Sequence, residues 1–329
     1  MSLVAPTLQR FFTDRLLRQR QASPRTVTSY RDSLRLLLIW VHNTKGIQPH
    51  RLDWADLDTA TITAFLDHLE RERNNSARTR NLRLTAIRSL FSYASLIHPE
   101  HVELIRRVLA IPPKRFDRPE ITFLTQAQLA VLLAAPDPDR WEGRRDRALL
   151  ILTAQTGLRV AELTGLNIGD VTVGDGANVR CLGKGRKHRA VPLTTATSTV
   201  LARWLAERDG LRPEPLFPTR TGRRLSPDAV ERLVAKHART AASNDPAFPD
   251  DRIHPHVLRH TCAMNLLHSG VDTAVIALWL GHADIRSTAT YLHADMTIKE
   301  RALQRMATTD LPASRYQPSD KVLAFLETL

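Results

Sequence analysis

The sequence predicts a mainly α-helical protein with a small β-sheet: an all-helical amino-terminal domain followed by a larger α+β domain. Apolar residues recur at helical spacing through most of the chain, and convincing strand patterns appear only around residues 178–193. A proline-rich segment separates the two regions. The chain of 329 residues can bury a sizeable core and is longer than most single domains.

The first domain is expected to span residues 1–110. Helical spacing of apolar residues predicts four helices, at 7–20, 24–40, 61–73 and 76–96. Ser23-Pro24 is a start signal for the second of them, because serine caps helices and proline suits the first turn. The fourth helix is expected to direct four apolar side chains inward: Leu82, Ile87, Leu90 and Phe91.

Residues 111–119 are the predicted linker, since three prolines and four charged residues cannot continue a helix. The second domain is expected over residues 120–310. It should contain helices near 125–133, 147–155, 194–208, 228–241 and 271–280, and strands at 178–182 and 189–193. The helix at 271–280 is almost continuously apolar, which predicts a buried helix ended by Gly281.

Composition favours a polyanionic partner. Lysine and arginine number 47 and the acidic residues 34, a formal net charge of +13. Nucleic acid is the first expectation and an acidic membrane surface the second. No apolar run is long enough to cross a bilayer and residues 1–20 lack a signal-peptide core, so a cytoplasmic protein without a membrane partner is expected. The distant Cys181 and Cys262 predict no disulfide framework.

The richest segment runs from His254 to Tyr291. His256 and Arg259 are three residues apart, so on a helix they share one face. His282 follows the Gly281 turn, and Tyr291 lies nine residues later, after Ser287 or Thr288 as a potential helix cap. The four histidines of this segment (His254, His256, His260 and His282) are also candidates for a metal cluster. No carboxylate or cysteine completes a familiar ligand spacing, so we predict neither metal nor cofactor, and we expect His260 to pack in the interior.

Two further motifs bring positive charge into the second domain. Arg159, in Thr-Gly-Leu-Arg-Val-Ala-Glu-Leu, follows a glycine turn and precedes a helix whose amino-terminal amides favour an anion. The alternative is a surface arginine or a partner of Glu162. Lys184, in Gly-Lys-Gly-Arg-Lys-His, lies in a basic hairpin loop, for which simple solvation is the alternative.

The fourth helix of the first domain is also strongly basic. Residues 71–88 contain six arginines and one acidic residue, Glu72. A solvated face is the ordinary explanation for such a run. The polar Asn81 stands among the arginines where alternating acids would be expected, and this pattern suits a helix in the major groove.

Together these motifs resemble the tyrosine recombinases, the phage-integrase and Xer-type family. The resemblance is strong over residues 120–300 and weaker over the amino-terminal domain, where 23–30 and 80–88 carry it. It implies six catalytic residues: Arg159, Lys184, His256, Arg259, His282 and Tyr291. It makes Glu162 a supporting partner of Arg159 and suggests eight DNA-binding residues: Arg25, Thr26, Arg78, Arg80, Arg83, Arg88, Arg186 and Lys187.

The chemistry of a phosphodiester explains these residue types. Guanidinium groups bind the non-bridging oxygens while staying charged, which suits Arg159 and Arg259. The Tyr291 phenol, with a reference pKa of about 10, needs help as a nucleophile, and His256 is a candidate to accept or relay its proton. Lys184 suits a general acid for the leaving 5′-oxygen, and His282 suits a hydrogen bond to the phosphate.

The resemblance implies a site-specific DNA recombinase or integrase that cleaves and rejoins strands through a covalent 3′-phosphotyrosine, without metal or ATP. It implies a C-shaped clamp on double-stranded DNA with inverted half-sites, a dimer on a site and a tetramer in the synapse, or pairing with a related recombinase. Action at the nucleoid and carriage on a mobile element fit the same expectation. A helix in the tail, 311–329, with Val322, Phe325, Leu326 and Leu329 on one stripe, is expected to pack on its own domain or on a neighbouring protomer.

Two other functions remain compatible with the motifs. A relaxing enzyme of the type IB topoisomerase kind shares much of this chemistry, although the separate helical domain and the tail argue against it. A non-catalytic DNA-binding protein could keep the same fold, although the complete set of catalytic residue types argues against that.

Overall fold

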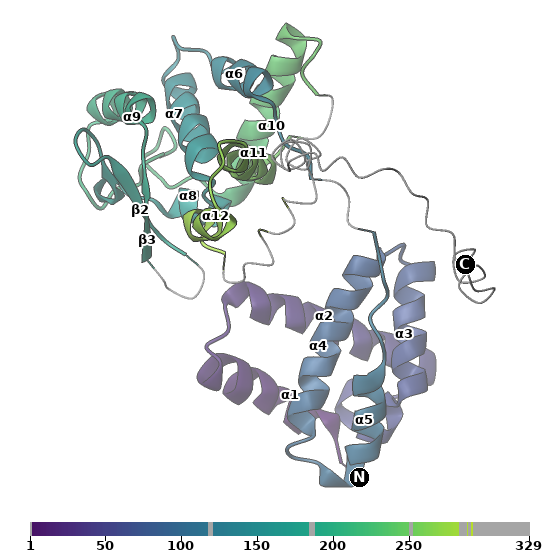
Figure 1. The fold of residues 1–329 in the computed structure, drawn as a ribbon. Coiled ribbons are helices and arrows are strands. Elements are labelled where there is room, and N and C mark those ends of the chain that lie inside the picture. The colour runs from purple at the N-terminus through teal and green to yellow at the C-terminus, as the bar shows by residue number, and fades with distance from the viewer. Residues whose placement is uncertain are drawn as a thin grey trace, which may run out of the picture. The chain divides into compact units, whose positions relative to one another are not determined.

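The computed structural model describes residues 2–117, 121–183, 188–249 and 253–282, together with Thr288 and Tyr291. The chain divides into two compact units, Met1–Pro119 (unit 1) and Glu120–Leu329 (unit 2). Helices dominate both units, and the described part of unit 2 also holds a small sheet, which confirms the predicted fold class (Figure 1).

Unit 1 is mainly helical over its described residues. Its α-helices are α1 (Val4–Arg10), α2 (Pro24–Lys45), α3 (Thr59–Arg71), α4 (Ala77–Ala94) and α5 (Val102–Ala110). A π-helix, Phe11–Gln19, continues α1, and short 3-10 turns occupy Pro49–Arg51, Trp54–Leu57 and Pro99–His101. The core is built around Trp54, Phe11, Phe65 and Phe91, each almost fully buried.

The predicted start of α2 is confirmed and its predicted end is wrong. Ser23 caps the helix by accepting a hydrogen bond from the Thr26 amide. The helix continues past Trp40 to Lys45 and ends where Gly46 adopts the left-handed conformation at φ 71°. The sequence reading stopped at the last residue of the apolar stripe, whereas the glycine fixes the true end.

The prediction that Leu82 points inward is also wrong. The buried face of α4 carries Leu84, Ile87, Phe91 and Ala94, and one turn earlier this face is occupied by Arg80. Leu82 lies on the opposite face and is 59% exposed. Four residues before Leu84, the same face of the helix reaches position 80 and not 82, so the buried residue at this turn is an arginine, which the apolar pattern did not predict.

Unit 2 combines seven α-helices of its described residues with three strands. The helices are α6 (Gln126–Ala134), α7 (Trp141–Thr156), α8 (Val160–Gly165), α9 (Thr195–Arg208), α10 (Pro227–Asn244), α11 (Pro255–His268) and α12 (Thr273–Leu280). After a 3-10 turn at Ile168–Asp170 come β1 (Val171–Thr172), β2 (Asn178–Leu182) and β3 (His188–Pro192).

The strands form an antiparallel sheet in the order β1-β2-β3, with Val179 opposite Val191 and Cys181 opposite Arg189. These four residues share one face of the sheet, because alternate residues of a strand point to the same side. Val179 and Val191 are buried in the main core of unit 2, together with side chains of α7 and α10. The hairpin predicted around residues 178–193 is therefore confirmed in its strands.

The prediction of a buried α12 holds for one face only. Ile276, Ala277 and Leu280 are buried, but Val275 is 46% exposed and Leu278 is 76% exposed. An almost continuous apolar run carries no periodicity, so the sequence could not indicate which face would be left uncovered. The predicted end at Gly281 is confirmed, with φ 64°.

Candidate active site

Arg159 is positioned by the junction of two helices. Gly157 ends α7 in the left-handed conformation at φ 60°, and a Cβ there would lie 2.5 Å from Leu280 Cδ2. The tight turn places Arg159 at the amino-terminal cap of α8. Its guanidinium donates to Glu162 Oε1 at 2.8 Å and to the carbonyl of Gly281 at 2.9 Å. The packing of α7 against α12 therefore requires a glycine at this turn.

The carboxyl end of α12 gathers three arginines from different elements. Its consecutive carbonyls at Trp279, Leu280 and Gly281 accept hydrogen bonds from Arg189, Arg259 and Arg159, respectively. The last carbonyls of a helix lack partners within the helix and carry the negative end of its dipole, so they attract cations. We call this set, Arg159, Arg189 and Arg259 on the end of α12, the arginine cluster.

Arg259 is the most buried member of the arginine cluster, with 4% of the residue exposed. It also donates to the carbonyl of Gly157. Burial and the nearby Arg159 lower the Arg259 pKa to about 10. At neutral pH the guanidinium still carries its charge, although burial and the neighbouring cation both disfavour it.

Glu162 is the carboxylate that balances the arginine cluster. Its oxygens accept hydrogen bonds from both the backbone and the side chain of Arg159, and from both terminal nitrogens of Arg189 at 3.0 and 2.8 Å. Burial alone would raise the Glu162 pKa, but the hydrogen bonds from Arg189 and Arg159 outweigh it and hold the pKa below the usual value. One carboxylate against three guanidiniums leaves a net positive site.

Sequence reasoning missed Arg189, although a signal was present. Arg189 is two residues before Val191 on β3, and the two-residue period of a strand puts both on the buried face. Applied to Arg189-Ala-Val191, this alternation indicates a buried arginine that requires a partner carboxylate.

Tyr291 is buried, with only 4% of the residue exposed. Its hydroxyl lies 3.1 Å from His260 Nδ1, and its ring stacks on His282 with centroids 6.4 Å apart. His282 uses its own Nδ1 on the Thr288 hydroxyl at 2.7 Å. His256 is exposed near the start of α11, and its ring centroid is 6.3 Å from that of His260.

The expected packing role of His260 is therefore incomplete, because its ring nitrogen faces the phenol oxygen. His260 is four residues after His256, so helical spacing already placed the two on one face. Burial raises the Tyr291 pKa above its ordinary value, although Arg259 acts in the opposite direction. Burial also lowers the pKa of His282 to about 4, so the ring beside the phenol is neutral at neutral pH.

Three predicted residues lie outside the described part of the chain: Lys184, Arg186 and Lys187. The expected tail helix, 311–329, also lies outside it. Among the described residues, no three histidine, cysteine or acidic side chains form a group that could hold a metal ion. No helix of the described segments is long and apolar enough to span a membrane.

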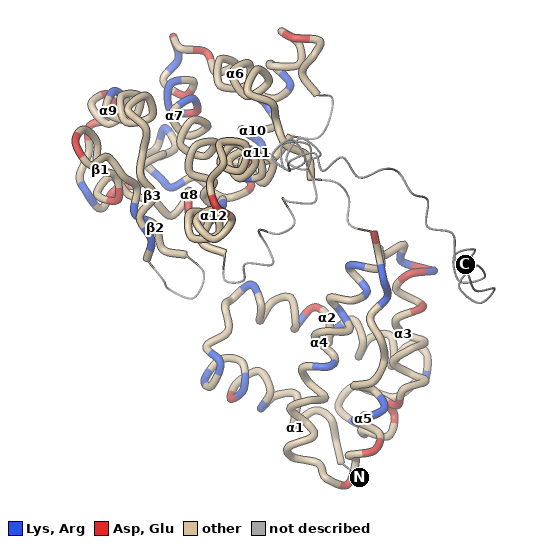
Figure 2. The backbone as a smooth tube through the Cα atoms, viewed as in Figure 1, with Lys and Arg blue, Asp and Glu red and all other residues tan. Residues whose placement is uncertain are grey.

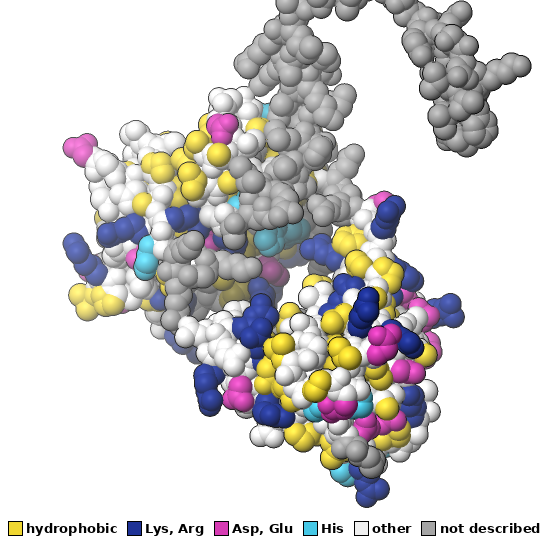
Figure 3. All heavy atoms as spheres, turned by 60° about the horizontal axis from the view of Figure 1, so that its bottom comes forward, with side chains coloured by type: hydrophobic (Ala, Val, Ile, Leu, Met, Phe, Trp, Pro, Cys, Tyr) yellow, Lys and Arg dark blue, Asp and Glu magenta, His cyan; other side chains and the backbone are white. Residues whose placement is uncertain are grey.

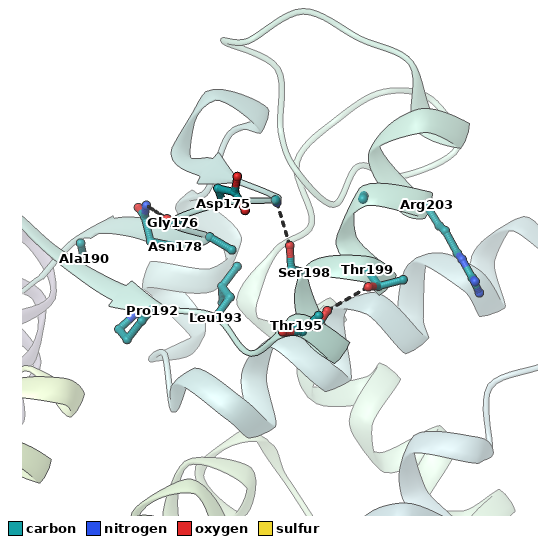
Figure 4. A pocket seen from close by; sticks show the side chains of 13 residues that line it. Asp175, Gly176, Asn178, Ala190, Pro192, Leu193, Thr195, Ser198, Thr199 and Arg203 are labelled. Carbon is teal, nitrogen blue, oxygen red and sulfur yellow. Dashed lines mark hydrogen bonds between the residues drawn. The ribbon is translucent and has the colours of Figure 1, made fainter.

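A separate hollow of about 960 Å³ lies between the β1–β2 turn and α9. Figure 4 shows Asn178 and Asp175 on the sheet side and Ser198, Thr199 and Arg203 on the α9 side. Ser198 accepts a hydrogen bond from the Gly174 amide, and Thr199 bonds to the backbone of its own helix. None of the six predicted catalytic residues lines this hollow, so we do not assign the site to it.

The basic side chains of unit 1 divide into exposed and structural ones. Figure 2 shows Lys and Arg along the helices of unit 1, and Figure 3 shows their side chains on its surface. Arg25 and Arg78 are exposed at the starts of α2 and α4, and Thr26 is partly buried beside Ser23. Arg83 is partly buried and donates to the Ser33 hydroxyl at 3.0 Å.

Two of the arginines predicted to contact DNA, Arg80 and Arg88, have partners within unit 1. Arg80 is 4% exposed and lies 3.4 Å from a carboxylate oxygen of Glu70. Arg88 donates to the carbonyls of Leu109 and Ile111 at the end of α5. Both guanidiniums therefore have partners inside unit 1.

Comparison with known proteins agrees with this geometry. Residues 122–297 match the model of the phage integrase family, and residues 8–96 match the phage integrase N-terminal SAM-like domain. The chain belongs to the phage integrase family. It is a tyrosine-type site-specific DNA recombinase, and its family-model matches cover most of both units.

Relatives extend over nearly the whole chain. A protein of Sinorhizobium fredii described as an integrase/recombinase is 47% identical over 99% of this chain and 98% of its own length. Tyrosine recombinase XerC of Pseudomonas fluorescens is 33% identical over 86% of this chain and 90% of its own.

Solved structures share the fold at low identity. XerH site-specific recombinase bound to a palindromic difH substrate matches with a TM-score of 0.66 at 22% identity, covering 87% of this chain and 81% of that one. The Tn1549 transposon integrase in complex with a circular intermediate DNA matches with a TM-score of 0.70 at 15% identity, covering 93% of this chain and all of that one. At such identities these structures show the fold alone.

Proposed function

We propose that this recombinase cleaves DNA with the Tyr291 hydroxyl, while Arg159 and Arg259 hold the scissile phosphate and Lys184 protonates the leaving 5′-oxygen. The observation that carries the proposal is that two guanidiniums, Arg159 at the start of α8 and Arg259 on α11, lie near the buried phenol of Tyr291. The product is a 3′-phosphotyrosine bond, which retains the energy needed for rejoining and requires no ATP.

The electrostatics support a phosphate between these groups. The arginine cluster carries three positive charges against the single carboxylate of Glu162, and burial and Arg159 already lower the Arg259 pKa. A phosphodiester would supply the missing anion, and two planar guanidiniums can bind its non-bridging oxygens. His282, which is neutral and stacked on Tyr291, would donate a hydrogen bond to the same phosphate. Exposed His256 would contact it from the start of α11.

For the DNA interface of unit 1 we propose the exposed face of α4. Arg78, Leu82 and Thr85 are exposed and follow one another at helical spacing. An arginine binds phosphate or guanine, and an apolar side chain contacts the methyl group of thymine. Arg25 and Thr26 at the start of α2 add contacts to the backbone of the DNA. Arg186 and Lys187 in unit 2 would act similarly on phosphates.

The partner we propose is double-stranded DNA with inverted half-sites, bound by two protomers per site and four in the synapse, or by this chain together with a related recombinase. A cyclic arrangement of identical protomers follows naturally from inverted half-sites. We further propose action at the nucleoid, carriage on a mobile element, and a tail at 311–329 that packs in cis or on a neighbouring protomer.

The direct test uses duplex fragments from the protein's own genetic locus, nicked near candidate sites to trap cleavage. An adduct that resists denaturation is expected with the unchanged protein and absent with Tyr291→Phe, which should still shift the same DNA in a gel. Specific binding without any adduct from the unchanged protein would contradict strand cleavage and favour an architectural role.

A further inference from the structure

The hydroxyl of Tyr291 faces a histidine that the proposed mechanism has not used. His260 Nδ1 lies 3.1 Å from the hydroxyl, with the two rings inclined at 62° and their centroids 5.6 Å apart. His282 lies against the phenol by stacking and directs its Nδ1 to Thr288 instead. Among the described side chains, His260 is therefore the one whose ring nitrogen is within hydrogen-bond distance of the nucleophilic oxygen.

We propose that His260 accepts the phenol proton of Tyr291 as the tyrosine attacks the scissile phosphate. This inference deepens the proposed function and rests on it. In the step, the O–H bond of Tyr291 breaks and its proton passes to His260 Nδ1. The phenol oxygen forms a bond to phosphorus, the bond from phosphorus to the 5′-oxygen breaks, and that oxygen takes a proton from Lys184. Rejoining returns both protons by the reverse path.

The protonation states of the free protein suit this transfer. The groups that face His260 are Tyr291, His254 at the cap of α11, and His256 and Arg259 on α11. Burial, followed by His256, Arg259 and His254, lowers the His260 pKa to about 4, so the ring is neutral at pH 7 and one of its two nitrogens can accept a proton. Burial raises the Tyr291 pKa, so the phenol keeps its proton until an acceptor takes it.

A bound phosphate would strengthen His260 as a base. The low pKa of His260 comes partly from Arg259, whose positive charge disfavours an imidazolium. A phosphodiester held by Arg259 offsets that charge at the moment when the proton must move. The acceptor is therefore weak in the free protein and improves when DNA occupies the site, which limits activation of the tyrosine in the absence of substrate.

His256 is a less suitable acceptor. It is exposed near the amino-terminal end of α11, and its ring contacts His254 and His260 within the described residues. Its pKa is lowered, first by desolvation and then by His254 and Arg259, but no contact joins it to the phenol. An exposed imidazole at this position is better suited to the phosphate than to the buried hydroxyl.

The test measures single-turnover adduct formation on a nicked duplex between about pH 6 and pH 9, the range where a neutral histidine acts as a base. At pH 7, His260→Ala should slow cleavage by about 100-fold or more. Its rate should rise about tenfold per pH unit relative to the unchanged protein, because only the ionised phenol remains reactive. Replacing Tyr291 with a fluorotyrosine, whose phenol is more acidic, should partly restore cleavage in the His260→Ala background.

His260→Asn separates proton transfer from positioning. Asparagine keeps a polar group near the place of Nδ1 but cannot take up a proton, so we expect it to show the same steep pH dependence as His260→Ala. If His260→Asn recovers the full rate, or if each variant is slower than the unchanged protein by a factor that does not vary with pH, the contact is only structural and the inference is overturned. The same holds if His256→Ala acquires the steep pH dependence and His260→Ala does not.

His268→Ala is the matched control, since it removes a histidine at the other end of α11, whose ring packs against Phe123; the rate of this variant and its pH dependence should stay unchanged. Gel shifts and thermal melting show that each variant folds and binds. An unchanged protein that forms no adduct at any pH defeats the proposed function itself, whereas an adduct with an unaltered profile in His260→Ala defeats this inference alone.

Discussion

Glu162 is the residue on which the arginines of the site depend. Its carboxylate is 5% exposed and pairs with Arg159 and with Arg189, whose side chain is 13% exposed. Removing one partner of a buried ion pair leaves uncompensated charge and destabilises a fold by about 3–5 kcal/mol. We predict that Glu162→Gln lowers the free energy of unfolding within this range and reduces cleavage, because Arg159 loses its anchor. Chemical denaturation and adduct formation measure the two effects.

The pH dependence of stability tests the same residue independently. The pKa of Glu162 is lower in the folded protein than its unfolded value of about 4.3, so the unfolded state binds more protons in the acid range. The stabilisation is complete above the unfolded pKa and is lost as the pH falls through the folded pKa. We therefore expect the unchanged protein to lose more stability than Glu162→Gln below about pH 4.3. Parallel acid dependence in the two proteins would contradict the role of this carboxylate.

At individual positions, the sequence predicted which residues belong to the site better than it predicted which residues contact one another. Arg159, Arg259 and Tyr291 were identified from motifs, but the pairing of Arg189 with Glu162 depends on which face of β3 is buried. Arg80 and Arg88 look identical in sequence to exposed arginines such as Arg78, and only packing against Glu70 and the end of α5 distinguishes them. A run of charged residues in the sequence shows only that charge is concentrated there, whereas the partner of each charged side chain is set by the tertiary structure.

Among the elements, α12 does most to assemble the site. Its carboxyl-terminal carbonyls hold three arginines that come from α8, β3 and α11. The glycine that ends the helix, Gly281, has φ 64°, and a Cβ there would lie 2.6 Å from Arg189 Nη1. Because Arg189 is fixed by Glu162 and by Trp279, it cannot yield freely. The end of α12 thus couples helix termination to the geometry of the arginine cluster.

We predict that Gly281→Ala reduces cleavage sharply and lowers stability by more than its backbone conformation alone requires. A left-handed non-glycine residue costs roughly 1–2 kcal/mol. Gly270→Ala is the matched control, since Gly270 follows α11 with φ 80° and has no atom within 4 Å of an added Cβ. It should lose only the backbone contribution and retain cleavage. Equal losses of stability and activity in both variants would show that the contact with Arg189 is unimportant. Thermal melting and adduct formation provide the comparison.

The boundaries of helices and strands were also predictable only where a local sequence signal sets them. Ser23 and Gly281 were read correctly because a cap and a left-handed glycine are local signals. The exposed face of α12 and the inward Arg80 were not foreseen, because both depend on what packs against a helix. The strands of the hairpin were predicted from alternation, whereas β1, with two residues, offers too little pattern to detect.

At the scale of the whole molecule, the net charge of +13 favours binding to DNA, whose phosphates are negatively charged. Each phosphate contact adds roughly 0.9 to the slope of log binding constant against log salt. We predict that the double variant Arg25→Ala, Arg78→Ala lowers this slope by about 2, since both side chains are exposed at helix starts. Titrations of binding at several salt concentrations measure it.

Arg88→Ala is the contrasting variant in the same unit. It removes a guanidinium that holds the carbonyls of Leu109 and Ile111, so it should lower the thermal stability of unit 1 and leave the salt slope unchanged. A reduced slope in Arg88→Ala, or an unchanged slope in the double variant, would contradict this assignment. The DNA would then be bound by the other arginines of α4.

The proposed function depends above all on Tyr291 as the nucleophile of strand cleavage. We would isolate the covalent adduct from a nicked substrate, digest both protein and DNA, and identify the modified residue by mass spectrometry. We expect a nucleotide attached through its 3′-phosphate to the peptide that contains Tyr291. Attachment to Tyr316 or to any other residue, or a linkage through a 5′-phosphate, would contradict it.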